Sequence, residues 1–222
     1  MRGRSLLLLM MCTAMLFACA TIPPSPLTAD AARTLRLENI NVTVAPEAVV
    51  SWANAENEYV NAHRTGGGQL PPRKITETGA IPGNPNAADE AVYNELVGSE
   101  DGKAYVRDKI SERVRTAIAQ QVKPRMLAGN RPVNLDVTIH SFTVPSAVQR
   151  AVIGGVPVMS ATAVLRDAST GEVIAERKEL IVAAAAGNGW LGALADQFFT
   201  DLDVRLANSY AEEYRNWLMP KT

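Results

Sequence analysis

Cys19 is the residue whose surroundings point most directly to a specific chemistry. Residues 16–19 read Leu-Phe-Ala-Cys, the leucine, small residue and cysteine of a lipobox. Two arginines stand before an uncharged apolar run over residues 6–17, which is too short to span a bilayer and is typical of a secretory signal. The sequence therefore predicts that residues 1–18 are removed and that acyl chains such as palmitate are attached to Cys19.

The leader contains features of two other processing routes. Cys12 also lies in the apolar run, but the bulky Met11 before it does not suit the lipoprotein peptidase. Residues 18–20 read Ala-Cys-Ala, which fits ordinary signal peptidase and would release a soluble periplasmic protein. In the lipidated form, about 0.8 kcal/mol per buried CH₂ makes the anchorage essentially irreversible. Because Ala20 and not aspartate follows the cysteine, we expect the periplasmic side of the outer membrane rather than the inner membrane.

No set of residues predicts catalysis or metal binding. The two histidines, His63 and His140, are far apart in sequence, and there is no C-x-x-C or H-x-x-x-H spacing. Neither a G-x-S-x-G elbow nor a G-K-[ST] motif occurs. We expect no enzyme activity, no metal and no cofactor. Adjacent carboxylates are expected on solvated helix faces or at helix starts, at Asp89-Glu90, Glu100-Asp101, Asp201 with Asp203, and Glu212-Glu213.

Residues 187–192 match the dinucleotide pattern G-x-G-x-x-G, but their context argues against it. The preceding strand belongs to an antiparallel hairpin, and only 30 residues follow Gly192. A second parallel strand with a ribose-binding carboxylate is therefore missing. This segment is better interpreted as a joint between strand and helix, where an outward Trp190 with Leu191 would dock on a partner or on the membrane interface. The alternative is that Trp190 is the first core residue of the last helix.

The composition excludes several classes of protein. With 22 basic and 23 acidic residues, the net charge is −1, so no nucleic-acid partner is indicated. Apolar residues make up 47% of the chain, enough for a folded core. Only Cys19 remains after cleavage, so no intrachain disulfide is expected.

The periodicity predicts the elements that would position any site. Apolar residues recur every four positions from Val106 to Val122, which indicates an amphipathic helix ended by Pro124. Alternation predicts strands at 35–44, with a bulge near Asn39, and at 133–144, with a second bulge before Phe142. A hairpin follows at 158–182, and an apolar stripe from Trp190 to Leu218 predicts one long helix. Short helices are expected at 51–62 and 86–96.

We therefore expect an α+β fold in which an antiparallel sheet packs against an amphipathic helix and a long C-terminal helix, in two layers. The predicted segments are the leader 1–18, a lipidated and proline-rich tether 19–33, an N-terminal strand with a glycine- and proline-rich excursion over 34–98, and a core domain over 99–222.

Within this layout, residues 134–144, the turn at 153–155, the hairpin turn Asp-Ala-Ser-Thr-Gly-Glu at 167–172 and the terminal helix together resemble uncharacterised alphaproteobacterial envelope lipoproteins. The layout is also similar to auxiliary lipoproteins of ABC-type transport systems. The resemblance covers about residues 100–218 and the leader, and it brings no active site.

Together these features predict a membrane-anchored periplasmic lipoprotein that acts as a non-enzymatic interaction or accessory module in envelope assembly or transport. Its partners would be membrane lipid, through acylated Cys19, and an envelope protein. The alternative is a carrier for a lipid or small apolar ligand, with the stripe of Leu194, Phe198, Leu202 and Leu206 closing a groove over the sheet.

Overall fold

A computed structural model describes residues 24–64, 87–146, 155–184 and 201–219 of the chain. None of the helices in these ranges has both the length and the apolar character needed to cross a membrane. In chain order the elements are α1 (Ala29–Thr34), β1 (Leu35–Trp52), α2 (Ala53–His63), α3 (Ala87–Gly98), α4 (Glu100–Gln121), the 3₁₀ turn η1 (Lys123–Arg125), β2 (Arg131–Val144), β3 (Val158–Asp167), β4 (Val173–Ala183) and α7 (Leu202–Leu218).

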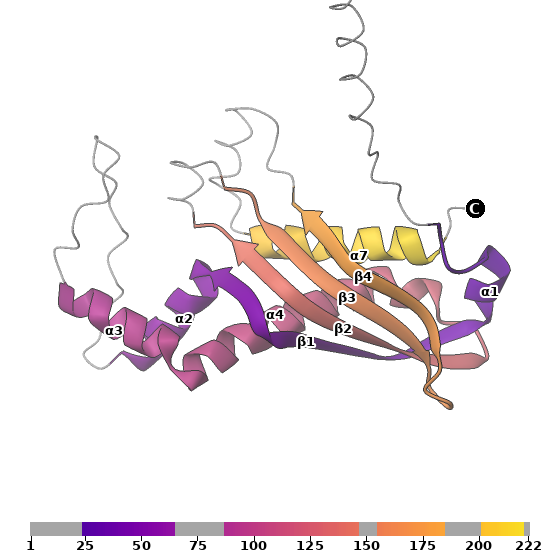
Figure 1. The fold of residues 1–222 in the computed structure, drawn as a ribbon, viewed down its shortest axis with the longest axis horizontal. Helices are drawn as coiled ribbons and strands as arrows, with labels where there is room; N and C mark the ends of the chain where they lie inside the picture. Colours follow the sequence, from indigo (N-terminus) through magenta and orange to yellow (C-terminus); the bar gives the residue numbers. More distant parts are fainter. Residues whose placement is uncertain (1–23, 65–86, 147–154, 185–200, 220–222) are drawn as a thin grey trace, which may run out of the picture.

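The four strands form one open sheet in the order β1-β2-β3-β4, and α4 and α7 pack together on one of its faces (Figure 1). Helix α4 lies along β1, and α7 lies along β4 and β3. The predicted α+β fold in two layers is confirmed. The pairs β2–β3 and β3–β4 are antiparallel as expected, but β1 pairs with β2 in parallel. A parallel pair needs a long crossover, which the chain through α2, α3 and α4 supplies.

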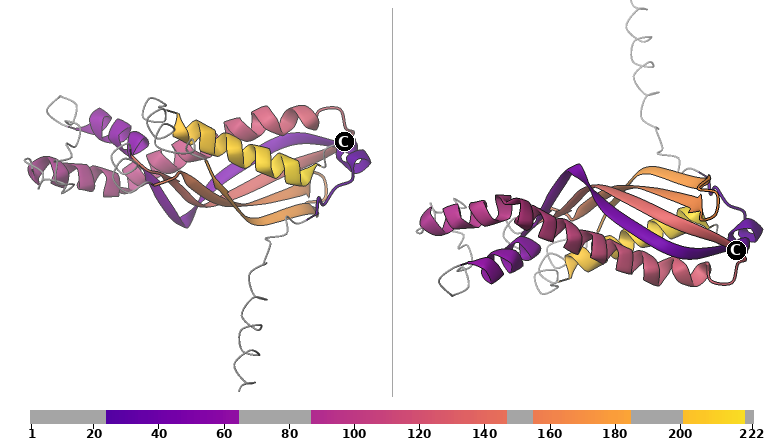
Figure 2. Two further views of the ribbon diagram at one scale, coloured as in Figure 1. Left: turned by 90° about the horizontal axis from the view of Figure 1, so that it is seen from above. Right: turned by 90° about the horizontal axis from the view of Figure 1, so that it is seen from below.

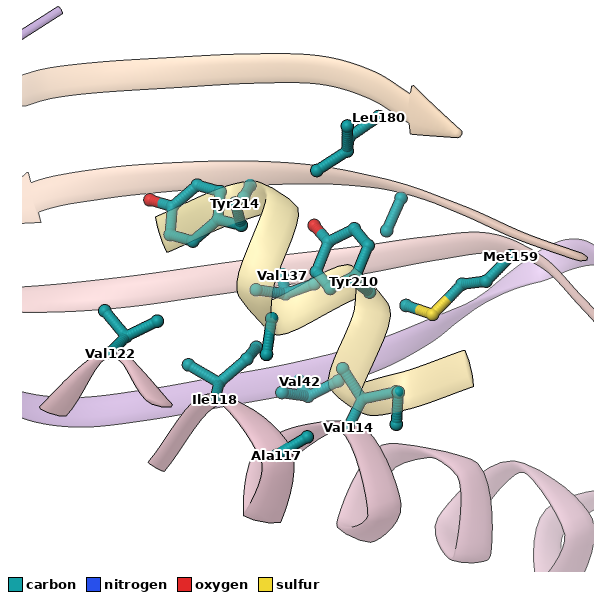
Figure 3. Close-up of a cluster of buried hydrophobic side chains, with 14 of the residues drawn as sticks. Val42, Val114, Ala117, Ile118, Val122, Val137, Met159, Leu180, Tyr210 and Tyr214 are labelled. Atoms are coloured by element: carbon teal, nitrogen blue, oxygen red, sulfur yellow. The ribbon is translucent and has the colours of Figure 1, made fainter. Parts of the chain in front are cut away.

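The core lies between the sheet and the two helices. The buried phase of β2 meets the four-residue stripe of α4, as amphipathic patterning requires. Tyr210 and Tyr214 of α7 are fully buried and point toward the sheet in the close-up (Figure 3). Neighbours labelled in the same view are Val42, Val114, Ala117, Ile118, Val122, Val137, Met159 and Leu180.

Both predicted bulges are confirmed by the strand register. The pairing of β1 with β2 shifts between Leu37 and Asn39, where the apolar phase of the sequence changes. The pairing of β2 with β3 shifts between Ile139 and Ser141, just before the buried Phe142. An extra residue in one strand moves the apolar side chains that follow to the opposite phase, so the core side stays apolar.

The predicted hairpin between β3 and β4 is confirmed, and Asp167 holds its turn. Its Oδ1 accepts hydrogen bonds from the backbone N–H groups of Ser169 and Thr170, at 2.9 and 3.0 Å. Its Oδ2 lies 2.7 Å from Nε of Arg131, at the start of β2. Arg131 first, and then the two backbone N–H groups, lower the pKa of Asp167 to about 2. Gly171 takes a φ of 75°, which a residue with Cβ adopts less readily.

The segment before β1 packs against the domain from Ser25 onward. The Ser25 hydroxyl lies 3.0 Å from the carbonyl oxygens of both Leu27 and Leu218. Leu27 and Ala32 join the core, and Thr28 caps α1 by accepting from the N–H of Ala31. Residues 25–33 of the predicted tether thus lie against the domain, beside the end of α7.

Helices α2 and α3 lie beside the first half of α4, at the end of the molecule away from α1 (Figure 2). The predicted short helices in these two regions are confirmed. Tyr59 of α2 contacts Tyr105 of α4 with ring centroids 5.3 Å apart, and Glu58 pairs with Lys109 at 2.8 Å. These contacts fasten α2 to α4.

One sequence prediction about the last helix is wrong. The apolar stripe indicated a single helix running from Trp190 to Leu218, but α7 begins only at Leu202. Asp201, directly before it, has φ −109° and ψ 38° and is the N-cap residue. Aspartate favours this position over a helix interior, because its side chain competes with the helical hydrogen bonds of the backbone.

Candidate functional site: the open face of the sheet

The residues singled out from the sequence as functional lie outside the described ranges. Cys19, Trp190, Leu191 and the glycine pattern at 187–192 all fall there. Within the described ranges, no group of three or more His, Cys, Asp or Glu side chains is placed to hold a metal ion. The structure therefore directs attention to a different part of the molecule, namely the sheet face that carries neither α4 nor α7.

This face is built by the polar phase of the strands, because side chains of a strand alternate between the two sides of a sheet. The apolar phase of β2 and β3 is buried under the helices, and the other phase is half-buried on the open face. Figure 1 shows the sheet in front of both helices. The half-buried side chains of the two central strands are Asn134, Asp136, Thr138, His140, Ser141 and Thr143 on β2, and Val158, Ser160, Thr162, Val164 and Arg166 on β3.

Hydrogen bonds connect these side chains from strand to strand. His140 Nε2 lies 2.9 Å from Thr162 Oγ1, and that oxygen accepts a hydrogen bond from the backbone N–H of Glu179 at 3.3 Å. Ser141 Oγ lies 3.1 Å from Ser160 Oγ in the next register position. The contacts of His140, Thr162 and Glu179 thus join three strands, and the separate Ser141–Ser160 pair joins two. Cross-strand pairs of this kind stabilise a sheet.

Glu179 adds a strained backbone conformation to this network. Its φ of 46° lies in the left-handed region, and the β3–β4 register shifts there, between the pairs Ala163–Arg177 and Ala161–Leu180. A non-glycine residue with this φ costs about 1–2 kcal/mol. Bulges that bend an edge strand are over-represented near functional sites. The bulge on β4 therefore includes the residue whose N–H donates to Thr162.

The charge on the open face is mixed. Arg166 Nε lies 3.4 Å from Asp136 Oδ2, and Lys178 Nζ lies 3.8 Å from Glu176 Oε2. Asn39 of β1 donates to Asn134 at 3.0 Å, so the polar character continues to the edge of the sheet. Ile181 of β4 is 68% exposed and pairs in register with Ser160, which places a large apolar side chain beside the hydroxyls. The face combines hydrogen-bonding groups and charges of both signs with several apolar side chains, of which Ile181 is the most exposed.

A second surface feature lies on the opposite side of β1. An open groove of about 510 Å³ lies between β1 and α4, and charged side chains of both signs from α4 line it. Arg107 of this groove donates to the carbonyl oxygen of Pro46 at 2.7 Å, so it is engaged in holding β1. The groove is shallow, and charged side chains make up much of its lining, which does not suit an apolar ligand.

The fold does not bring together His63 and His140, which are far apart in sequence. His140 lies on the polar side of β2, as expected from the alternation. His63 is exposed at the end of α2, with Nδ1 2.9 Å from the carbonyl oxygen of Tyr59 and its ring stacked on the Tyr59 ring at 4.1 Å. Each histidine has its own partners.

The carboxylates divide into expected and unexpected cases. Glu100 and Glu212 pair with Lys103 and Arg215 on exposed helix surfaces, as predicted. Asp203 lies at a helix start, one of the two predicted positions, but it is buried rather than solvated, with only 4% exposed. Its Oδ2 lies 2.8 Å from Nε of Arg113, whose side chain crosses from α4 to α7.

Burial raises the pKa of Asp203, and the Arg113 guanidinium counteracts part of this rise. The position in the first turn of α7 also favours a negative charge there. No pattern in the sequence indicated that α4 and α7 would bring Arg113 and Asp203 together.

The alternative function requires an apolar stripe that closes a ligand groove. Where the structure describes this stripe, its side chains pack in the core instead. Leu202 and Leu206 are 3% and 0% exposed and belong to the core cluster. Leu194 and Phe198 lie outside the described residues.

Fold and surface together define a small α+β domain with one helix-covered sheet face and one open polar face. A family model described as a family of unknown function, DUF6778, matches residues 93–222. The chain belongs to this family.

Several proteins of known structure are similar to this chain at low sequence identity. A candidate lipoprotein from Caulobacter crescentus is similar at 17% identity and a TM-score of 0.31, over 50% of this chain and 80% of that one. The PelC dodecamer from Paraburkholderia phytofirmans is similar at 12% identity and a TM-score of 0.34, over 85% and 93% of the two chains. A DUF330 protein from Xanthomonas campestris is similar at 13% identity and a TM-score of 0.34, over 88% and 92%. Among curated proteins no match is found.

Proposed function

We propose that this protein is a lipid-anchored component of the bacterial envelope whose domain works as a non-enzymatic interaction module. Acylated Cys19 would hold it in the membrane, facing the periplasm and in the outer rather than the inner membrane. The open face of the sheet would bind a protein partner of an envelope assembly or transport system.

The observation that carries this proposal is the hydrogen-bonded network of His140, Thr162 and Glu179 on an open sheet face. The network fixes two side chains of the central strands and a backbone N–H of β4 in one arrangement before any partner arrives. Preorganised groups lose little conformational entropy on binding. Ile181 beside them supplies exposed apolar area of the kind that interface centres contain.

The chemistry of the face favours a protein over other ligands. Its charges are paired and of both signs, whereas nucleic acid requires a basic surface. A lipid or apolar ligand carrier, the alternative function, needs an apolar cavity, and the stripe residues Leu202 and Leu206 are packed into the core instead.

The test is in-cell crosslinking of the tagged full-length protein, followed by affinity purification and mass spectrometry. Ile181→Asp is the informative variant, because Ile181 is exposed and its replacement leaves the core intact. We expect envelope proteins to be enriched with the natural chain and lost with Ile181→Asp, and Cys19→Ser to leave the membrane fraction. Recovery of the natural chain only as an uncrosslinked monomer under gentle solubilisation would contradict the proposal.

A further inference from the structure

The end of the domain at which α1 lies carries a surface suited to a membrane. The chain between α4 and β2, residues 122–130, runs Val-Lys-Pro-Arg-Met-Leu-Ala-Gly-Asn and holds two basic residues and no acidic one. We call residues 122–130 the anchor-proximal loop. Leu127 in it is 57% exposed, while its neighbour Met126 is 1% exposed and belongs to the core. An outward leucine between basic residues has no evident role in the fold.

The loop is held in a fixed position beside the N-terminal segment. The carbonyl oxygen of Met126 accepts a hydrogen bond from the N–H of Leu37 at 2.9 Å. Gly129 lies so close to Thr34 and Leu35 that a Cβ on it would meet their backbone atoms. Met126 is also bonded back to Lys123 through its own N–H at 3.0 Å, which closes the turn that presents Leu127.

The charges at this end leave the loop with unpaired cations. Three carboxylates here are each bound to an arginine: Asp30 to Arg33, Glu38 to Arg36, and Asp167 to Arg131. Lys123 and Arg125 form no ion pair within the described ranges and are exposed. The loop itself contains no acidic residue, so it keeps a small basic excess.

The route of the chain directs this end toward the bilayer. Ser25, beside the end of α7, is six residues from Cys19, and six extended residues span at most about 22 Å. Figure 1 shows α1, the end of α7 and the connection from α4 to β2 together at this end. If Cys19 is acylated, the anchor-proximal loop lies within reach of the lipid headgroups.

We infer that the anchor-proximal loop is a second membrane contact, in which Leu127 enters the headgroup region and Lys123 and Arg125 bind the phosphates of anionic phospholipids. This inference rests on the proposed lipid anchor. It fixes the orientation of the domain, with the strand axes rising from the bilayer and the open face of the sheet directed sideways, accessible to a partner. Basic residues near an anionic surface contribute about fivefold each to membrane affinity.

The test uses the acylated protein in phospholipid vesicles with an environment-sensitive fluorophore on a single introduced cysteine, at Leu127→Cys or, as the control, Thr138→Cys on the open face. With one quarter phosphatidylglycerol in phosphatidylcholine, we expect the probe at 127 to shift to the blue and to be quenched by lipid-borne nitroxide, while the probe at 138 stays in water. Adding Lys123→Gln and Arg125→Gln should cut the quenching at 127 several-fold.

The outcomes separate the two proposals. A protein whose mass lacks the acyl chains would refute the lipid anchor itself, and the loop inference with it. An acylated protein whose probe at 127 is no more quenched than the probe at 138 would refute the loop contact and leave the anchor standing. Leu127 is exposed, so its replacement does not disturb folding; circular dichroism of each labelled variant verifies this.

Discussion

The side chain of His140, at the bulge of β2, reaches Thr162 of β3, with Nε2 of the imidazole 2.9 Å from Oγ1 of the threonine. The same oxygen accepts the backbone N–H of Glu179, the residue with the strained φ on β4. A hydroxyl can take part in both contacts, because it has one donor proton and two acceptor positions. The contacts among His140, Thr162 and Glu179 therefore depend on a single hydroxyl group.

Replacing Thr162 by valine should loosen this face. Valine keeps the β-branched shape and removes only the hydroxyl, so we expect a loss of about 1 kcal/mol in the free energy of unfolding. Faster amide exchange at Glu179 should accompany it. The matched control is Thr138→Val: Thr138 stands opposite Thr162 in the register and bonds to no other side chain within the described residues. Equal effects of the two substitutions in urea denaturation would show that the network does not hold the face.

Removing the cation beside Asp203 should destabilise the packing of α4 on α7. Arg113→Met keeps the aliphatic stem but leaves a buried carboxylate without its partner, which we expect to cost about 2 kcal/mol at neutral pH. Arg115→Met, on an exposed site of the same helix, should change stability by less than about 0.5 kcal/mol.

The pH dependence provides an independent check on the same pair. Because the pKa of Asp203 is raised in the folded state, its charge costs stability as the pH rises above the usual value, and protonation relieves the cost. Loss of Arg113 raises that pKa further. The deficit of Arg113→Met relative to the natural chain should therefore shrink as the pH falls from 7 toward the raised pKa. A deficit independent of pH would mean that the ion pair contributes nothing.

Asp167 should behave in the opposite way with pH. Its pKa is lowered to about 2, so its stabilising contribution is complete above the usual carboxyl pKa and disappears as the pH falls through about 2. We expect Asp167→Asn to lower Tm by a few degrees at pH 7 and to approach the natural chain as the pH falls from about 4 toward 2. Asp136→Asn removes a carboxylate from an exposed pair and should leave Tm nearly unchanged. Parallel Tm curves for Asp167→Asn and the natural chain down to pH 2 would contradict this account.

The hydroxyl of Tyr214 should be dispensable. The side chain is fully buried, its oxygen has no hydrogen-bond partner in the part of the chain that the structure describes, and burial raises the pKa of the hydroxyl. Removing an unsatisfied buried hydroxyl relieves a desolvation cost of about 1 kcal/mol or more, so Tyr214→Phe should leave stability unchanged or raise it. Tyr214→Ala, which opens a cavity, should cost about 3–5 kcal/mol. A destabilisation by Tyr214→Phe in thermal denaturation would show that the hydroxyl has a partner.

The local features of the fold could be predicted because they are written in short-range patterns. The phase changes near Asn39 and before Phe142 each marked a bulge, and the stripe from Val106 to Val122 marked α4. The alternation of β2 and β3 also indicated which side chains are polar. It did not indicate that α4 and α7 would both pack on the other face of the sheet. That outcome depends on how distant elements meet, which alternation alone does not specify.

The long-range features could not be predicted for the same reason. Parallel pairing of β1 with β2 depends on the route of the chain through α2, α3 and α4, and local sequence is silent on strand partners. The burial of Asp203 follows from Arg113 on another helix, 90 positions earlier. The start of α7 at Leu202 was hidden because the apolar stripe continues on both sides of Asp201. In the first two cases a contact between distant residues decides the outcome.

Site-specific photocrosslinking in living cells tests the central claim most directly. A photoreactive amino acid is placed at Thr138 on the open face or at Thr116, an exposed threonine of α4 on the opposite side of the molecule. The account predicts a discrete crosslinked envelope protein from position 138 and none, or far less of it, from position 116. The same product in equal yield from both positions, or no product from 138 while the protein remains in the membrane, would contradict a docking role for the open face.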